Sequence, residues 1–161
     1  MSILEVVITQ EMKKTALQKA EELPKLRNSI TSGGGNLVGF LGEEVAKFVL
    51  GGTLSNTYDY DLVLDSGKTV DVKTKKTGFE PKPHYECSVA EYNTKQKCDY
   101  YAFVRVDDQR DRAWFLGMYE KGAYYKDAKL LKKGDVDPSN NFVVKANCYN
   151  LPIYKLQELD E

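Results

Sequence analysis

The chain has 161 residues, of which 42% are hydrophobic and 29% are charged, a composition typical of one globular domain with its own core. No run of eighteen apolar residues and no charged-then-apolar leader is present, which disfavours a membrane span and a secretory signal. The three cysteines are far apart and lack CxxC spacing, which disfavours structural zinc and a disulfide framework. They indicate a reducing, cytoplasmic compartment.

The net charge of −1 gives no global attraction to nucleic acid, but the charges are unevenly distributed. The segment 68–97 holds seven lysines against four acidic residues. Either an ordinary solvated surface or a surface that faces nucleic acid accounts for this local excess.

The first 50 residues predict a strand and two helices. A short β-like run covers Ile3–Ile8, and apolar spacing predicts a helix from Thr9 to about Leu23, where Pro24 disfavours continuation. Ser32–Gly35 is expected to form a flexible loop. A second helix is expected from about Leu37 to Leu50, ended by Gly51 and Gly52. Its apolar face is expected to hold Leu41, Val45, Phe48 and Val49.

The remainder of the chain is rich in strand signals, with a turn at residues 65–68 and a short helix at 91–97. The order helix, three strands, helix, strand predicts an α/β (α+β) fold with a mixed central sheet flanked by helices. A β-rich C-terminal extension is expected over residues 112–161. The expected strands are 58–64, 69–75, 85–89, 100–106, 113–118, 142–146 and 151–156.

The stretch from Tyr58 to Lys73 carries the clearest chemical signal. Asp71 and Lys73 are two residues apart, so in a strand they share a face at a spacing of about 7 Å. Asp59 and Asp61 share a face of the preceding strand. The surrounding Leu and Val residues indicate buried strands, in which a charge needs a partner or a metal. Asp59 lies further from this apolar run and is the second choice. Solvated charge on an exposed strand is the simpler explanation.

Two carboxylates and a lysine are the groups that a metal-assisted phosphodiester hydrolysis needs. Mg²⁺ binds oxygen ligands, keeps several waters and takes only one or two carboxylates. The ion activates water and neutralises charge on the phosphate, and a nearby lysine stabilises the transition state electrostatically. Asp61, Asp71 and Lys73 supply these roles in this chain.

Upstream, Gly42-Glu43-x-x-Ala46 lies in the second helix. Glycine would allow this helix to pack close to the sheet. A glutamate there has two explanations: it interacts with the helix dipole, or it reaches the water shell of a metal beside the hairpin. The residues alone leave open whether Glu43 or the adjacent Glu44 has this role, since the helical wheel places Glu44 nearer the edge of the apolar face.

The set of Gly42-Glu43-x-x-Ala46, then Asp61 before an apolar strand, then Asp71-x-Lys73, resembles the PD-(D/E)XK nuclease superfamily, including its GExxA-containing resolvase and phage members. The resemblance covers roughly residues 36–106, the expected catalytic core of a single domain in which residues 1–32 form an N-terminal strand and helix. It implies a restriction-endonuclease-like αβββαβ core. Tyr60 stands where the family has proline, and Asp71 replaces the commoner glutamate.

The resemblance implies DNA cleavage that depends on Mg²⁺ or Mn²⁺. The metal ligands would be Asp61, Asp71 and the carbonyl of Val72, with Glu43 as the helix carboxylate and Lys73 as the catalytic lysine. Gln96-x-x-x-Tyr100 is similar to a further family motif in which the glutamine contacts the water or the phosphate, although Tyr100 also suits the start of a core strand. Four lysines are expected to contact DNA: Lys75, Lys76, Lys95 and Lys97.

The sequence therefore predicts a divalent-metal-dependent DNA endonuclease, and the family resemblance implies that its product carries a 5′-phosphate. A homodimer is expected because cutting two strands needs two sites. The single histidine, His84, disfavours histidine-based zinc or HNH-type chemistry. The alternatives are a catalytically inactive DNA-binding or assembly module of the same fold, an exonuclease, and a junction resolvase.

Overall fold

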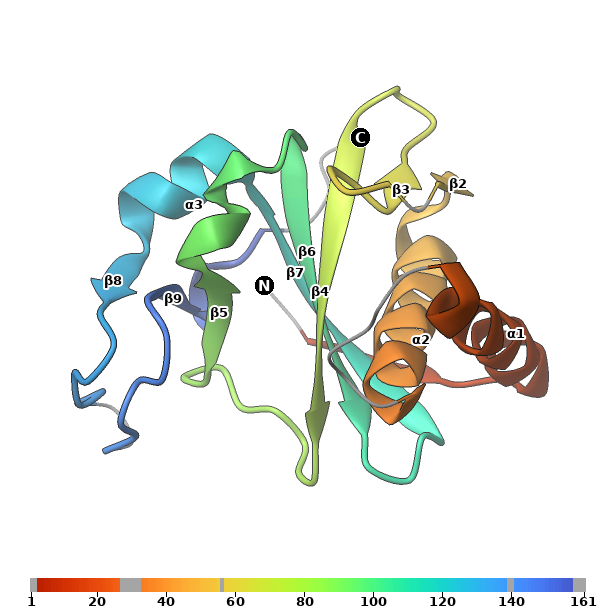
Figure 1. Cartoon of the computed structure of the whole chain (residues 1–161), viewed down its shortest axis with the longest axis horizontal. Coiled ribbons are helices and arrows are strands. Elements are labelled where there is room, and N and C mark those ends of the chain that lie inside the picture. Colours follow the sequence, from red (N-terminus) through yellow and green to blue (C-terminus); the bar gives the residue numbers. More distant parts are fainter. Residues whose placement is uncertain (1–2, 27–32, 56, 139–140, 158–161) are drawn as a thin grey trace.

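The computed structural model describes residues 3–26, 33–55, 57–138 and 141–157 (Figure 1). These residues form a mixed α/β fold with two sheets. The main sheet has the order β1-β7-β6-β4-β3-β2, and its strands are β1 (Leu4–Val7), β2 (Thr53–Leu54), β3 (Leu62–Val63), β4 (Thr69–Thr77), β6 (Tyr100–Asp107) and β7 (Arg112–Glu120). The small sheet has the order β5-β9-β8, with β5 (Glu86–Ala90), β8 (Lys129–Leu131) and β9 (Cys148–Pro152).

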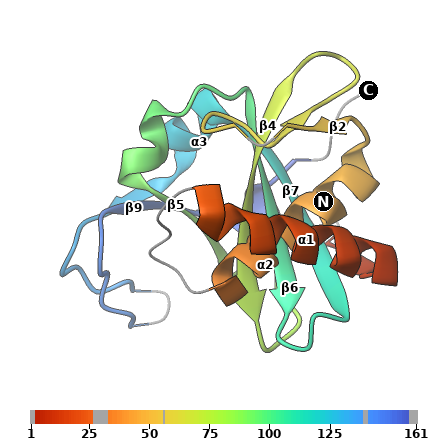
Figure 2. The ribbon, with the colours of Figure 1, turned by 45° about the vertical axis from the view of Figure 1, so that its right-hand side comes forward.

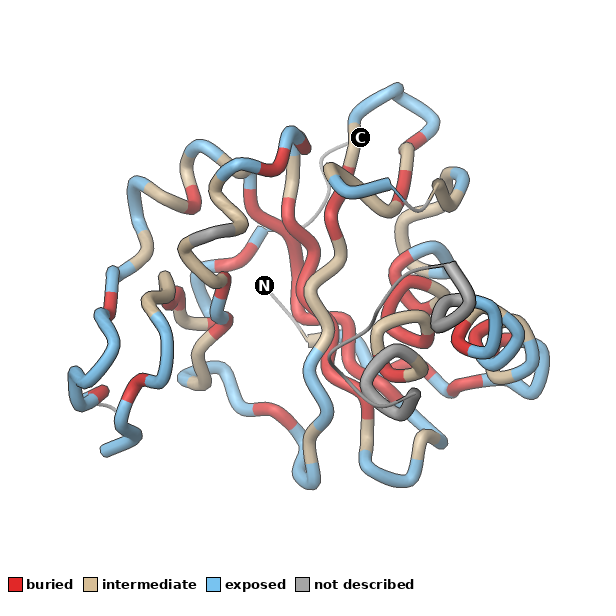
Figure 3. The backbone as a smooth tube through the Cα atoms, viewed as in Figure 1, coloured by how far each residue is buried: buried red, intermediate tan, exposed pale blue. Residues whose placement is uncertain are grey.

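Different layers cover the two faces of the main sheet. The helices α1 (Gln10–Leu26) and α2 (Gly33–Leu50) lie on one face, and the small sheet lies on the other with α3 (Lys121–Asp127) (Figures 1 and 2). Each interface has its own apolar core, one built around Leu41, Val45 and Val70, the other around Tyr101, Trp114 and Tyr124. The strands between the two layers are accordingly buried along most of their length (Figure 3).

The central pair of strands, β4 and β6, is parallel, with Asp71 opposite Tyr101 and Lys73 opposite Phe103. Side chains alternate along a strand, so Asp71, Lys73 and Lys75 share the face that the small sheet covers. Val70 and Val72 point to the helices instead. The chain between these strands forms β5 and the 3₁₀ helix η1 (Glu91–Lys95), since parallel neighbours need a crossover connection.

The helices agree with the sequence prediction in position, but α2 begins and α1 ends at other residues than predicted. α2 begins at Gly33 rather than near Leu37, so the glycines at 33–35 form its first turn and the predicted loop there is wrong; Ser32 lies outside the described residues. α1 extends past position 24 to Leu26. Phe48 is 68% exposed and not on the buried face. The end of α2 is confirmed, because Gly51 and Gly52 have φ angles of 76° and 85°.

The predicted strand 58–64 is wrong over most of its length. Only Leu62–Val63 pairs as β3, and the preceding residues form a loop in which Thr57 Oγ1 donates to the carbonyl O of Tyr60 at 2.9 Å. Asp59 and Asp61 therefore do not share a strand face. The Asp59 Oδ1 accepts a hydrogen bond of 3.0 Å from the backbone N of Lys97. Strand β4 and the turn before it are confirmed, with Gly67 at a φ angle of 91°.

The second half of the chain departs further from the prediction. The strand expected at 85–89 is β5, which belongs to the small sheet rather than to the central one. The expected helix 91–97 is the shorter η1, and α3 and β8 were not predicted. The segment 142–146 does not form the expected strand; its Val143 forms an isolated bridge with Val136. The strand expected at 151–156 is β9, displaced toward the N-terminus, followed by the 3₁₀ helix η2 (Ile153–Lys155).

Strand β7 confirms the prediction at 113–118, and it completes the main sheet between β6 and β1.

Within the described part of the chain, every helix is too short or too polar to cross a bilayer.

Candidate active site

The site lies where β3 ends beside β4. β3 pairs with β4 through Thr69 and Val70, and in the described part of the chain the next residues of β4 have no strand neighbour on that side. The carboxylate of Asp61 occupies this edge, and its Oδ2 accepts a hydrogen bond of 2.9 Å from the backbone N of Val72. The backbone N of Asp61 in turn donates to the carbonyl O of Val70 at 2.9 Å. Two hydrogen bonds to the backbone of β4 thus hold Asp61 at the end of the β3–β4 hairpin.

Asp71, Lys73 and Gln96 form one connected polar cluster. Lys73 Nζ lies 2.8 Å from Asp71 Oδ2 and donates to Gln96 Oε1 at 3.1 Å. Gln96 Nε2 donates to Asp71 Oδ1 at 3.2 Å and to the carbonyl O of Tyr58 at 2.9 Å. Asp71 and Gln96 are 5% and 6% exposed, so the cluster is shielded from bulk water. In such surroundings, charge–charge interactions are stronger than in water.

The carboxylate of Asp61 has a strongly perturbed pKa. Burial and, to a smaller extent, the negative charges of Glu43 and Asp71 together raise the pKa of Asp61 from 3.8 to about 8, against the opposing hydrogen bond from Val72. Burial disfavours the charged form of an acid, and like charges add to the effect. The edge of β4 thus concentrates negative charge, and a bound cation there would relieve it.

Glu43 and Glu44 have different surroundings. Glu43 lies on α2 and is 8% exposed, and its charge acts on Asp61. Glu44 lies 3.7 Å from Lys19 Nζ, forming an ion pair between α2 and α1. The approach of α2 to the sheet depends on Gly42, since a Cβ there would lie 1.8 Å from Thr74 Oγ1 on β4. This close packing places the residue after Gly42 beside the hairpin.

Two residues that support the cluster have no signal in the sequence. The Lys73 ammonium lies 5.5 Å from the ring centroid of Tyr101, whose hydroxyl is 2.6 Å from that of Tyr125. Lys121 Nζ donates to the carbonyl O atoms of Thr94, at 2.9 Å, and of Gln96, and thereby holds the end of η1. Tyr101 could be recognised only from its register beside Asp71, and Lys121 only from the position of α3.

The four lysines expected to contact DNA are separated by the structure. Lys75 is on the same face of β4 as Lys73, whereas alternation places the exposed Lys76 on the opposite face. Lys95 and Lys97 are exposed at the end of η1 and just after it. His84 is exposed, and its ring packs edge-on against Tyr85.

The fold and the site define a mixed α/β protein with a buried acid–lysine–glutamine cluster at the edge of a mixed sheet. Comparison with known proteins finds no family model and no curated protein that matches the chain.

Proposed function

We propose that the protein is a divalent-metal-dependent DNA endonuclease, with Asp61 and Asp71 as the metal ligands and Lys73 as the catalytic lysine. The observation that carries this proposal is the joining of Asp71, Lys73 and Gln96 into one buried cluster beside Asp61. These residues come from the loop just before β3, from β4 and from the end of η1, and the two acids and the lysine match the acid-acid-lysine set of the PD-(D/E)XK resemblance. The restriction-endonuclease-like core is part of this proposal.

The donor atoms fit Mg²⁺ or Mn²⁺. Among the described residues, no three His, Cys, Asp or Glu side chains gather closely enough to enclose a metal ion. Mg²⁺ is usually held by one or two carboxylates and keeps several waters, so Asp61 and Asp71 suffice. The Asp71 Oδ2 contacts Lys73 Nζ but receives no well-aligned hydrogen bond from the described residues, and so keeps acceptor capacity. The carbonyl of Val72 is the third proposed ligand.

Each remaining side chain has a role that its position supports. When bound, the ion supplies Lewis-acid activation of water and neutralises charge on the phosphate. Lys73 presents its ammonium to the developing charge of the transition state. Gln96 fixes Asp71 and Lys73 in one geometry through its two hydrogen bonds to them. Glu43 adds a carboxylate from the side of α2, where it can accept a hydrogen bond from a metal-bound water.

The proposal also covers the contacts with the substrate, the product and the oligomeric state. Lys75, Lys95 and Lys97 would contact the DNA backbone, and the 5′-phosphate product and the homodimer follow from the family resemblance.

The proposal is tested by nicking of supercoiled plasmid in Mg²⁺ with purified Asp71→Asn and Lys73→Ala variants. We expect each variant to lose at least about 100-fold in rate, because each removes a charge that acts in the transition state. The matched control is Asp65→Ala, which removes a carboxylate from the exposed turn beside the site and should cleave at the wild-type rate. Circular dichroism establishes that each variant is folded.

Full activity in both folded variants would overturn the proposal. The alternative, a catalytically inactive DNA-binding module, predicts that the wild type binds DNA without cleaving it. Calorimetry with Mn²⁺ separates the two functions, because a nuclease site should lose metal affinity in Asp61→Asn. Unchanged Mn²⁺ affinity would favour the DNA-binding module.

A further inference from the structure

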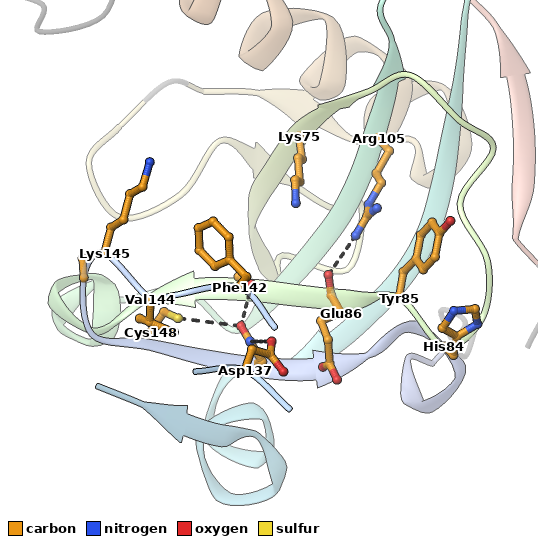
Figure 4. Close-up of a pocket in the computed structure, with 13 residues that line it drawn as sticks. Lys75, His84, Tyr85, Glu86, Arg105, Asp137, Phe142, Val144, Lys145 and Cys148 are labelled. Atoms are coloured by element: carbon orange, nitrogen blue, oxygen red, sulfur yellow. Dashed lines mark hydrogen bonds between the residues drawn. The ribbon is translucent and has the colours of Figure 1, made fainter. Parts of the chain in front are cut away.

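A cavity of about 510 Å³ lies two residues along β4 from the proposed catalytic lysine (Figure 4). Its walls come from β4, β5, β6 and β9 and from the segment around Phe142. None of the acids at the edge of β4 lines it. A smaller pocket lined by Lys73, Lys75 and Arg105 lies between the cavity and the active site. The volume is within the range of about 300–1,000 Å³ common for small-ligand sites.

One wall of the cavity is cationic. Lys75 and Arg105 are directly opposite each other on β4 and β6, and both side chains extend into the cavity (Figure 4). Arg105 is 7% exposed, and its Nη2 donates to the backbone O of Glu86 at 2.8 Å. Neither residue forms an ion pair with a carboxylate of the described residues. The Arg105 guanidinium also lies 5.4 Å from the ring centroid of Tyr85, which compensates part of the cost of its burial, and a bound anion would neutralise its charge.

The opposite wall carries hydrogen-bonding groups and an aromatic ring. Asn150 and Asp137 are each 7% exposed, and Ser88 Oγ donates to Asn150 Oδ1 at 2.5 Å. The backbone N of Asp137 donates to the carbonyl O of Phe142 at 2.8 Å, and Phe142, a residue that is 52% exposed, lines the cavity. This wall offers hydrogen-bond acceptors and a flat apolar face.

We propose that the cavity binds a single unstacked nucleotide of the DNA strand, with its phosphate on Lys75 and Arg105 and its base against Phe142. The assignment of the ligand to DNA rests on the proposed nuclease function. Lys75 lies about 7 Å from Lys73 along the same face of β4, so the bound nucleotide adjoins the one being cleaved. The enzyme would accordingly prefer single-stranded DNA, strand ends or flaps to an intact duplex.

The two walls favour a nucleotide over a simple inorganic anion. A phosphate needs only the cationic wall, and the carboxylates of Glu86 and Asp137 on the other side would repel it. In a nucleotide, by contrast, the base separates the phosphate from this acidic wall, and carboxylate oxygens accept hydrogen bonds from amino groups of bases. Aromatic side chains stack on any base, as in other proteins that bind single strands.

The test is calorimetric titration of the full chain with deoxycytidine monophosphate, deoxycytidine and inorganic phosphate, in EDTA at low salt. We expect the monophosphate to bind at least about 10-fold more tightly than either fragment. Lys75→Ala should weaken this binding at least about 10-fold, since it removes a charge-assisted contact. Lys76→Ala is the matched control: it makes the same charge change on the opposite face of β4 and should leave the nucleotide affinity unchanged.

Two further variants examine the two ends of the ligand. Arg105→Gln should abolish binding of both the monophosphate and inorganic phosphate. Phe142→Ala should weaken binding of the monophosphate about 10-fold without changing that of phosphate, because it removes only the base contact. Lys75 and Phe142 are exposed, so the test does not depend on the buried Arg105 variant folding.

The proposal is overturned if the monophosphate fails to bind at millimolar concentration, or if Lys75→Ala and Lys76→Ala lose affinity equally. Because EDTA removes the metal and no bond is cleaved, this result is independent of the nicking assay. A chain that nicks DNA without binding the nucleotide would contradict only the cavity proposal. A chain that binds the nucleotide while Asp71→Asn remains active would contradict only the catalytic assignment.

Discussion

Replacing Gly42 by alanine tests whether the close packing of α2 on β4 builds the active site. An added Cβ would lie 1.8 Å from Thr74 Oγ1, 2.6 Å from its Cγ2 and 2.7 Å from its Cβ. Non-bonded carbon atoms prefer separations of about 3.5–4.0 Å, so the helix would have to move away from the strand. Overpacking of this kind costs about 1–3 kcal/mol or more.

The matched control is Gly39→Ala on the same helix, where an added Cβ meets no atom of the described residues within 4 Å. Replacing glycine by alanine inside a helix stabilises it by about 1 kcal/mol. Both variants gain this contribution, so the difference between their free energies of unfolding isolates the steric cost at Gly42. We expect Gly39→Ala to be more stable than the wild type by about 1 kcal/mol, and more stable than Gly42→Ala by about 2–3 kcal/mol.

The assay is urea unfolding followed by circular dichroism in metal-free buffer. A double-mutant cycle adds Thr74→Ala, which removes the two nearest atoms, and Thr74 Oγ1 has no hydrogen-bond partner among the described residues to lose. We expect a favourable coupling of at least about 1 kcal/mol between Gly42→Ala and Thr74→Ala. Equal stabilisation by Gly42→Ala and Gly39→Ala would refute the reasoning.

Two more predictions follow from perturbed pKa values. Folded Asp61 keeps its proton up to a pKa of about 8 and the unfolded chain releases it near 3.8, so between these values the folded state binds more protons and the free energy of unfolding decreases as pH rises. In EDTA, Asp61→Asn should lack this decrease, which has a ceiling of about 6 kcal/mol. Urea titrations from pH 4 to 9 that give both proteins the same pH dependence of the free energy of unfolding would contradict the burial of Asp61. Burial raises the pKa of Cys87 and of Cys98 to about 12, so iodoacetamide at pH 8 should label the more accessible Cys148 first. Peptide mapping by mass spectrometry checks this, and labelling of Cys87 or Cys98 at the rate of Cys148 would show the prediction to be wrong.

The proximity of the site residues depended on packing that the sequence did not predict correctly. Asp59 and Asp61 were expected on one strand face, but the chain bends before Leu62, and only Asp61 reaches the edge of β4. The Gln96-x-x-x-Tyr100 pattern by itself says little, because a glutamine and a tyrosine can occur at that spacing in any sequence. Gln96 forms hydrogen bonds to Lys73 and Asp71, which are 23 and 25 positions earlier in the sequence, because the end of η1 lies against β4.

In the second half of the chain, too, local sequence patterns did not predict which distant segments pair. The strand at 85–89 was predicted from a local pattern, but its partner, β9, is about 60 residues further along the sequence, as in the pairing of Ser88 with Asn150. The nucleotide-sized cavity depends on this pairing together with the register that places Lys75 opposite Arg105. Local periodicity reports which residues are apolar, and it carries no information about which distant strand they will meet.

What the sequence by itself determined was local: strand β4 with Asp71 and Lys73 on one face, the end of α2 at Gly51, and the acid-acid-lysine order that suggests nuclease chemistry. Only the tertiary structure decided that Asp61 occupies the edge of β4, that Gln96 joins the cluster, and that α2 approaches closely enough for Glu43 to act on Asp61. The physical reason is that backbone alternation and glycine stops depend on neighbouring residues, whereas burial, pKa and side-chain contacts depend on which distant segments the cores bring together.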